Sequence, residues 1–348
     1  MCDVFLVFSQ GDAVVKEHVC DGAVLEGILR ALGCRERASV IESAKVNEIN
    51  SCSRPGDPAW DITIKLLKCI RNLSMEPLTL DKLDRAGTIP VLVQLLKEDT
   101  NAARNEDIIS PCPARRELES IVLQSMFYLC RLNRHRQTHA AQAGVIPSLM
   151  QVVRSANPLK QFALPLLCDL AHASPTARAH LWTCEGLLLF LELLEDKYWQ
   201  IDAIKSISAW LVYDTVQMEE VLLVPTNVLR IVRCFRAAQD NEFENLLEPL
   251  LDMLIRSVRL NQSLGRTSLF VTEILLRLRI VPKAIVRKNL LKMLKVLFES
   301  YTSPTQFLVE YNLHPILHSL AQDENNMILV KEIASQLLQA ILVAASVG

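Results

Sequence analysis

The chain has 348 residues, of which half are hydrophobic and only 5% are aromatic, and its formal net charge at pH 7 is −2. A net charge so close to zero excludes a globally basic nucleic-acid-binding protein. With only ten glycines and no long Gly/Ser-rich linker, residues 1–348 are predicted to form one elongated domain, and the aromatic-poor composition favours helices packed on helices.

The first predicted elements are helix corners, in which a glycine ends one helix and an apolar run with helical spacing begins the next. Copies start at Asp21 (DGAVLEGILRALG), Ala86 (AGTIPVLVQLLKE) and Ala143 (AGVIPSLMQVVRS). Glycine accepts the positive φ of a helix end, and a proline in the next first turn loses no hydrogen bond. Weaker copies begin at Glu185, Thr226, Thr267 and Tyr311.

The second residue of each copy marks the spacing of these corners. From Gly144 onward, consecutive markers stand 41 to 44 residues apart, at Gly186, Asn227, Ser268 and Asn312. A period of about 42 residues with two or three helices in each unit is the pattern of armadillo and HEAT proteins. The sequence therefore predicts an all-α, right-handed superhelical solenoid of about seven armadillo-like or HEAT-like repeats.

The earlier intervals, from Gly22 to Gly87 and on to Gly144, are longer, and two polar, turn-rich stretches account for the excess. These stretches run over residues 34–58 and 99–117. Both are predicted to be surface loops inserted between repeats, because a longer loop adds little closure entropy. A docking or phosphorylation role for these loops stays open.

A longer helix precedes each corner, and its residues align from repeat to repeat. The aligned position is occupied in turn by Asn72, Arg131, Asp169, Trp210, Met253 and Lys295. Pro165 and Pro249 share a position four residues earlier and lie two periods apart. Each proline is expected to bend its helix at the same phase, because it removes one backbone hydrogen bond.

In armadillo arrays this long helix lines the concave face, so the aligned position predicts a ladder of side chains along a groove. Arginines could grip a phosphorylated or extended protein segment, and a tryptophan could anchor it. The alternative is that the tryptophan is core and the arginines are solvated. The candidate binding residues are Asn72, Arg131, Asp169, Trp210 and Lys295, with Arg134 and Arg136 from the RLNRHR turn.

The sequence disfavours one specific armadillo function, the binding of basic nuclear-import peptides. Nuclear-import receptors of the armadillo class carry Trp and Asn four residues apart on the long helix, where they clamp an extended basic peptide. Only Asn72 matches that pattern here, because the residue four positions earlier is Lys68. A receptor for basic cargo peptides is therefore not expected.

A basic stretch provides a second candidate surface. Between Val228 and Ser300 there are 13 Lys/Arg against 7 Asp/Glu, a surplus of six positive charges. Such a stretch is either a solvated helix face or a patch for an acidic or phosphorylated partner. Its basic residues include Arg230, Arg233, Arg287, Lys288, Lys292 and Lys295.

The sequence contains none of the motifs that would indicate catalysis or a cofactor. A glycine-rich phosphate loop, a Gly-x-Ser-x-Gly elbow, a His-Glu-x-x-His motif and the kinase catalytic motifs are all absent. His135 and His139 share one helix face but have no third candidate ligand nearby, so no metal site is predicted. The chain is expected to be non-enzymatic and to need no cofactor.

The same approach predicts the compartment and the class of partner. Cys69, Cys130, Cys168 and Cys234 lie in helical apolar runs, where a thiol behaves as a small hydrophobe, so a reducing compartment is expected. No signal peptide and no apolar run of about 20 residues is present. We expect a cytoplasmic protein that binds proteins rather than nucleic acid, membranes or small molecules. Homodimerisation stays open.

One segment shows a specific family resemblance. Residues Tyr128 to Trp182, followed by YWQIDAIKSISAWL from Tyr198, resemble the C-terminal armadillo region of the fungal septation-initiation and mitotic-exit network protein kinases. That family belongs to the sterile-20-like and MAP-kinase-kinase-kinase-like branch and has plant relatives of similar layout. Its members carry an N-terminal kinase domain, which this chain lacks.

The resemblance implies a non-catalytic module that localises or regulates a cell-cycle protein kinase at the spindle pole body and division site. The partners it implies are a spindle-pole scaffold, a Ras-like GTPase or other kinase-network components. Two alternatives stay open. The chain could be a stand-alone armadillo adaptor for unrelated protein cargo, or a fragment of a full-length serine/threonine kinase.

Overall fold

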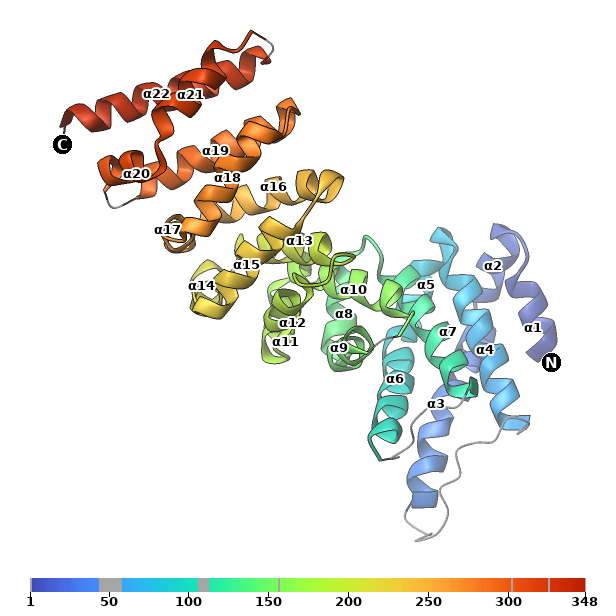
Figure 1. The fold of residues 1–348 in the computed structure, drawn as a ribbon. Helices are drawn as coiled ribbons and strands as arrows, with labels where there is room; N and C mark the ends of the chain where they lie inside the picture. Colours follow the sequence, from blue (N-terminus) through green and yellow to red (C-terminus); the bar gives the residue numbers. More distant parts are fainter. Residues whose placement is uncertain are drawn as a thin grey trace. The chain divides into compact units, whose positions relative to one another are not determined.

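The computed structural model describes residues 2–43, 58–105, 113–155, 157–301, 303–324 and 326–347. These residues form α-helices, one 3₁₀ turn and no strand (Figure 1). Two compact units divide the chain, unit 1 over Met1–Cys184 and unit 2 over Glu185–Gly348. The single domain over residues 1–348 therefore stays a prediction.

Unit 1 contains both long and short helices. In chain order its elements are α1 (Cys2–Ser9), α2 (Ala13–Cys20), α3 (Ala23–Ser43), α4 (Pro58–Ser74), the 3₁₀ turn η1 (Pro77–Thr79), α5 (Leu80–Arg85), α6 (Thr88–Asn105), α7 (Pro113–Cys130), α8 (Arg134–Ala143), α9 (Ile146–Arg154), α10 (Lys160–Ala173) and α11 (Pro175–Thr183).

Unit 2 likewise contains both long and short helices. Its elements are α12 (Gly186–Leu193), α13 (Gln200–Leu211), α14 (Thr215–Leu222), α15 (Pro225–Ala237), α16 (Asp240–Arg256), α17 (Val258–Gly265), α18 (Ser268–Ile280), α19 (Ala284–Ser300), α20 (Pro304–Tyr311), α21 (Leu313–Gln322) and α22 (Ile328–Val347).

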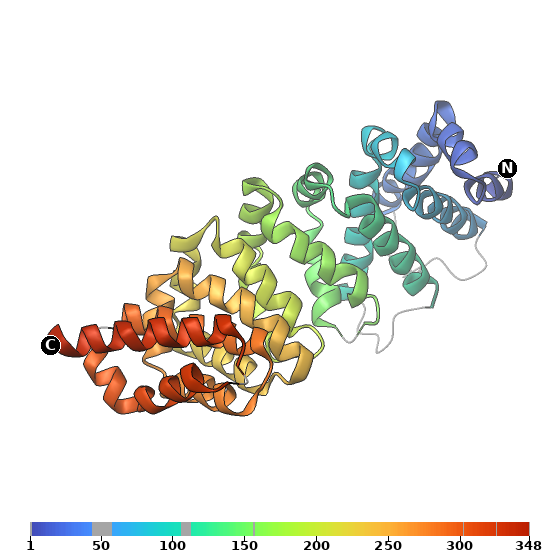
Figure 2. The same cartoon turned by 90° about the horizontal axis from the view of Figure 1, so that it is seen from above.

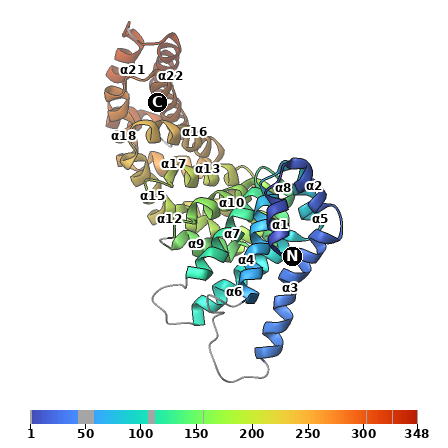
Figure 3. The same cartoon turned by 90° about the vertical axis from the view of Figure 1, so that its right-hand side faces the viewer.

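Every third helix is a long one, and within each unit these long helices pack side by side. In unit 1, α4 lies against α7 and α7 against α10, as Figure 3 shows for the first pair. In unit 2 the row is α13, α16, α19 and α22. Figure 2 shows the helices of this unit in yellow-green to red. Three helices per repeat is the armadillo arrangement. The all-α, armadillo-like fold predicted from the sequence is confirmed.

The predicted corner at Gly144 has the backbone geometry that a glycine allows. Its φ of 85° is left-handed, and its amide donates to the carbonyl of Ala141 at 2.9 Å. The next amide, that of Val145, donates to the carbonyl of Ala140 at 3.2 Å. This pair of bonds is a Schellman motif, which satisfies the last carbonyls of α8. Helix α9 then begins at Ile146, with a proline in its first turn.

Three of the other corners also have a marker residue with positive φ, whereas the markers Asn227 and Ser268 lie in α15 and α18 and have no positive φ. Gly22 and Gly87 also have positive φ, as does Asn312 with φ of 46°. At the fourth corner the left-handed residue is Glu185, one position before the marker Gly186. A glutamate pays a steric cost in this conformation that glycine avoids, so packing must stabilise this corner.

The two predicted inserted loops overlap helices in part. Helix α3 continues to Ser43, α6 continues to Asn105 and α7 begins at Pro113, so the helices extend into both segments. Loop boundaries at residues 34, 99 and 117 are therefore wrong, because polar composition does not by itself end a helix. Residues 44–57 and 106–112 lie outside the described residues.

Both prolines of the predicted register lie inside long helices. Pro165 is within α10 and Pro249 within α16. A proline in a helix interior lacks the amide that would bond to the carbonyl four residues earlier. In α16 that carbonyl belongs to Asn245. The shared position agrees with the repeat register, and the bend itself stays a prediction.

Replacement of Pro249 tests whether the repeat tolerates a continuous helix. We expect Pro249→Ala to fold with unchanged helical content and a free energy of unfolding equal to the parent or higher by about 1 kcal/mol, because alanine restores the missing backbone bond. Circular dichroism and urea denaturation measure both quantities. Loss of the folded state would show that α16 needs its proline.

Candidate protein-interaction site

Three of the predicted ladder residues lie in unit 1, on or beside successive long helices. Asn72 is on α4, where its Nδ2 donates to Oγ of Ser9 at 3.1 Å. Arg131 directly follows α7 and is exposed, with its guanidinium 5.9 Å from the ring centroid of Phe127. Asp169 is on α10. Their order follows the packing of α4, α7 and α10, and their role in binding stays a prediction.

The carboxylate of Asp169 is part of the contact between α10 and α8. Its Oδ2 accepts a hydrogen bond from Nε2 of Gln137 at 3.0 Å. Burial raises the pKa of Asp169, and this effect outweighs the opposing influence of His172, Arg131 and the Gln137 bond. The charged form of Asp169 is therefore disfavoured by folding.

Trp210 is core and not a groove anchor. Its side chain is 1% exposed, and its ring packs edge-on against that of Phe190, with 6.5 Å between centroids. The indole Nε1 donates to Oδ2 of Asp214 at 2.8 Å, which satisfies its polar atom inside α13 and the following turn. The expected apolar anchor at this position is therefore wrong.

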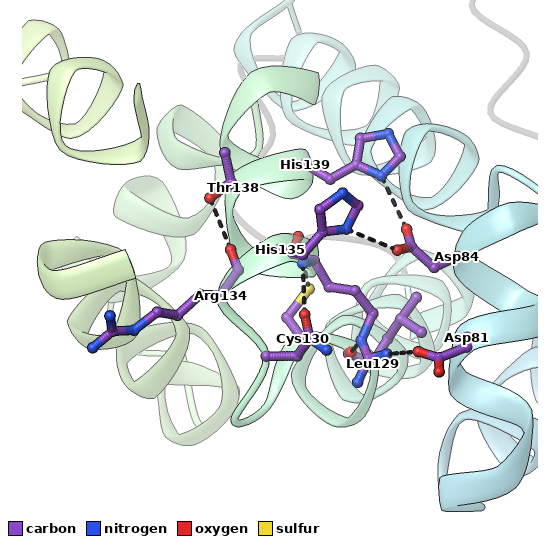
Figure 4. A network of polar contacts seen from close by, with 10 residues as sticks. Asp81, Asp84, Leu129, Cys130, Arg134, His135, Thr138 and His139 are labelled. Carbon is purple, nitrogen blue, oxygen red and sulfur yellow. Dashed lines mark hydrogen bonds and ion pairs between the residues drawn. The ribbon is translucent and has the colours of Figure 1, made fainter. Parts of the chain in front are cut away.

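Arg136 is also not available to a ligand. The residue is 5% exposed, and its Nε donates to the carbonyl of Leu129 near the end of α7. Its Nη1 lies 2.7 Å from Oδ1 of Asp81 on α5. Arg136 thus joins α8 to α7 and α5, whereas Arg134 is exposed and points away from this network (Figure 4).

The two histidines of α8 belong to the same network. Nδ1 of His139 lies 3.0 Å from Oδ1 of Asp84, and Nδ1 of His135 lies 3.3 Å from Oδ2 of the same carboxylate (Figure 4). Asp84 is the residue before the last of α5. This shared carboxylate ties α5 to α8, in support of a structural reading of the cluster.

A comparison of two arginines tests which of them stabilises the fold. We expect Arg136→Ala to lower the free energy of unfolding by about 2 kcal/mol, because it leaves a buried carbonyl without its donor and removes a largely buried cation from its carboxylate. Arg134→Ala removes an exposed side chain two residues earlier and should change stability by less than about 0.5 kcal/mol. Urea denaturation of both variants measures the difference. Equal losses would contradict the assignment.

Asp169 gives a pH-dependent prediction. Because its pKa is raised by folding, its protonated form stabilises the parent below the unfolded-state pKa, and that contribution is lost as pH rises through the folded-state pKa. Asp169→Asn stays neutral and can still accept the Gln137 bond. We expect its stability advantage over the parent to be small near pH 4 and larger at neutral pH. Urea titrations at several pH values test this, and an advantage that grows on acidification would refute it.

Two of the predicted basic residues lie on α15. Arg230 has its Nε 3.4 Å from Oε1 of Glu195 and donates from Nη1 to Asn227 at 3.2 Å. Arg233 is exposed on the same helix. Neither contributes to the groove of unit 2, so any binding role for them needs a separate surface.

Lys295 does line a groove, which lies over three long helices of unit 2. The groove has a volume of about 940 Å³ and is formed by side chains of α13, α16 and α19. These helices adjoin one another in that order. The groove is lined chiefly by Lys205, Val212, Asn245, Glu248, Pro249, Asp252, Ile255, Ile285, Lys288, Lys292, Lys295 and Glu299.

The acidic side of this groove was missed at the sequence level. Glu244, Glu248 and Asp252 lie four residues apart along α16, a spacing that places them on one face of a helix. The i, i+4, i+8 spacing of these acids is visible in the sequence. The net basic charge of the region gave no indication of it. Lys288 and Lys292 were recognised as basic residues of one helix, and the structure places both in the groove.

A second hollow, in unit 1, is less suited to hold a charged segment. It has a volume of about 630 Å³ and lies between α3, α6 and α8. Among the described residues, its lining contains no lysine, arginine, aspartate or glutamate, and His139 is already 3.0 Å from Asp84. The groove of unit 2 is therefore the better candidate interaction site.

Other kinds of site find no support in the described part of the chain. In that part, no group of three or more His, Cys, Asp or Glu side chains could hold a metal ion. Its cysteines are unbridged, and burial raises the pKa of the Cys130 and Cys234 thiols to about 12. No described helix has both the length and the apolar character needed to cross a membrane.

The three-helix repeat and the groove over its long helices define the class: this is an armadillo-like helical repeat protein. An engineered protein of known crystal structure superposes on 98% of the chain and 74% of its own length, with a TM-score of 0.66 and 14% identity. That likeness concerns the fold alone. No protein-family model matches the chain.

Sequence comparison identifies the relatives. The chain is 36% identical over 345 residues to cytokinesis protein sepH of Aspergillus terreus and 32% identical over 349 residues to MAP3K epsilon protein kinase 1 of Brassica napus. It is 28% identical over 343 residues to cell division control protein 7 of Schizosaccharomyces pombe. Each match covers at least 98% of this chain, which confirms the resemblance seen in residues 128–182.

The chain spans about a quarter of the length of these relatives, from 23% to 29%. The matched region is all-helical in its described residues, whereas a protein kinase domain places its ATP-binding lysine on a strand. The similarity therefore concerns a region outside the kinase domain. The matched proteins include ones named for cytokinesis and cell division.

Proposed function

We propose that this chain is a non-catalytic protein-interaction module that regulates or localises a protein kinase pathway of septation and mitotic exit. The observation that carries the proposal is the match of nearly the whole chain to cytokinesis and cell-division proteins, on an armadillo-like fold. Such repeats present extended surfaces that suit protein ligands better than small molecules. The groove of unit 2 is lined by both basic and acidic side chains that a protein ligand could contact.

The partners and location in this proposal are those that the family resemblance implies. A spindle-pole scaffold, a Ras-like GTPase or another component of the kinase network would be the bound protein. The module would then act in the cytoplasm, at the spindle pole body and at the division site. Its contribution would be to place a kinase near these structures, not to catalyse phosphoryl transfer.

The relatives favour a module that operates beside a kinase domain. One of them is named as a MAP3K epsilon protein kinase, and the matched region is 24% of its length. If the repeat region and the catalytic domain share one chain, binding by the repeats would determine where the kinase acts. The alternative of an adaptor for unrelated cargo predicts binding outside this pathway.

Direct binding measurements test the proposal. We expect the purified chain to bind at least one of three purified components, namely a spindle-pole scaffold, a Ras-like GTPase and a network kinase, with micromolar or tighter affinity. A control set of unrelated proteins of similar charge should bind at least about tenfold more weakly, which is about 1.4 kcal/mol. Biolayer interferometry gives both affinities.

The competing adaptor function makes the opposite prediction. If all three network components bind no better than the control proteins, the chain does not belong to this pathway. Circular dichroism of the protein batch before immobilisation checks that the chain is folded.

A further inference from the structure

The groove over α13, α16 and α19 presents its charges in bands, with one dominant sign on each helix. Helix α13 contributes Lys205. Helix α16 contributes the acidic residues Glu248 and Asp252, and α19 contributes Lys288 and Lys292. Because α16 lies between α13 and α19, the order of signs across the groove is basic, acidic, basic.

These charges are not neutralised by one another. Three lining residues do form ion pairs: Glu244 pairs with Lys283 at 3.1 Å, and Lys295 pairs with Glu299 at 3.8 Å. Within the described part of the chain no ion pair engages the five band residues, Lys205, Glu248, Asp252, Lys288 and Lys292. A ligand with the opposite sign over each band would gain charge-assisted contacts along the whole groove.

The surfaces between the bands offer apolar contact and a backbone acceptor. Ile255 is 57% exposed, and Val212 and Ile285 are each 41% exposed. Pro249 lacks an amide hydrogen, so the carbonyl of Asn245 loses its usual helical donor, and both residues line the groove. That carbonyl can accept a hydrogen bond from a ligand N–H group.

The spacing of the bands matches one extended backbone conformation. Packed helices lie about 8–10 Å apart. A polyproline II segment has three residues per turn and rises about 3.1 Å per residue, so every third side chain returns to the same edge after about 9 Å. In a β-strand the third residue along points to the opposite face, so a strand does not place successive charges over successive helices.

We propose that this groove binds a polyproline II-like segment of a partner protein that carries acidic, basic and acidic side chains at every third residue. The acidic residues lie over Lys205 and over the Lys288 and Lys292 pair, and the basic residue lies over the α16 acids. The sign pattern reads the same in both chain directions, so either polarity of the segment satisfies it. This inference rests on the proposed function and adds the chemistry of the bound segment.

Synthetic peptides of about ten residues test the pattern, with proline at several intervening positions to favour polyproline II. One peptide has the order acidic, basic, acidic at three-residue spacing. A second has the same composition in the order acidic, acidic, basic, and a third keeps the first order at two-residue spacing. Fluorescence anisotropy should show the first binding at least about tenfold more tightly than the others.

Reversal of one charge in the groove tests which helix contacts the middle residue of the peptide. Glu248→Lys should weaken the first peptide about tenfold and strengthen a peptide whose three charges are all acidic. Glu220→Lys is the matched control, because Glu220 is exposed on α14 and does not line the groove. It should leave both affinities unchanged. Equal binding of all peptides, or no effect of Glu248→Lys, would overturn the proposal.

The result is separable from the pathway assignment. If a network component binds the parent and Glu248→Lys equally well and the peptides are not distinguished, the groove proposal is wrong and the proposed function stands. If the peptides are distinguished but no network component binds, the groove specificity stands and the pathway assignment is wrong.

Discussion

Packing of each long helix against the next long helix is the constraint on which the rest of the structure depends. A single helix of 17 residues such as α16 is marginal in water, and its apolar side chains need a partner surface. Leu250 of α16 and Leu290 of α19 are fully buried. Because the buried faces must meet in this way, the outward faces of α13, α16 and α19 are brought together as well. The groove is a consequence of core packing.

Local backbone signals made the fold predictable. A glycine with positive φ followed by a proline in the next first turn acts within a few residues, so it can be recognised without knowing what packs on it. Gly87 and Gly144 behave as expected. Glu185 shows the limit of this reasoning, because its left-handed conformation depends on contacts that a sequence pattern does not reveal.

The candidate site was harder to predict, because a helix turns by about 100° with each residue. The aligned position chosen from the repeat includes Trp210 and Met253, which are buried, whereas the preceding residues Ala209 and Asp252 line the groove. A shift of one residue thus exchanges core for surface. Lys295, at the same nominal position, does line the groove.

Contacts between residues that are distant in the sequence were a second reason why the site was hard to predict. Arg136 in an RLNRHR turn has the composition of a solvated cation, and only the fold brings Asp81 to it. A surplus of basic residues likewise says nothing about the acidic row on α16 that lies beside it in space. Composition alone therefore did not identify which residues share the groove.

The polar ties between helices join each repeat only to the repeat beside it. Gln200 bonds to Glu242, Ser257 to Glu219 and Arg287 to Asn326, with 42, 38 and 39 residues between the partners. No long strand or crossing connection spans several repeats in the described part of the chain. Under tension, such an array loses repeats in succession from a free end and lengthens in small steps at modest force. Stretched between two attachment points, the folded chain would thus behave as an extensible spacer.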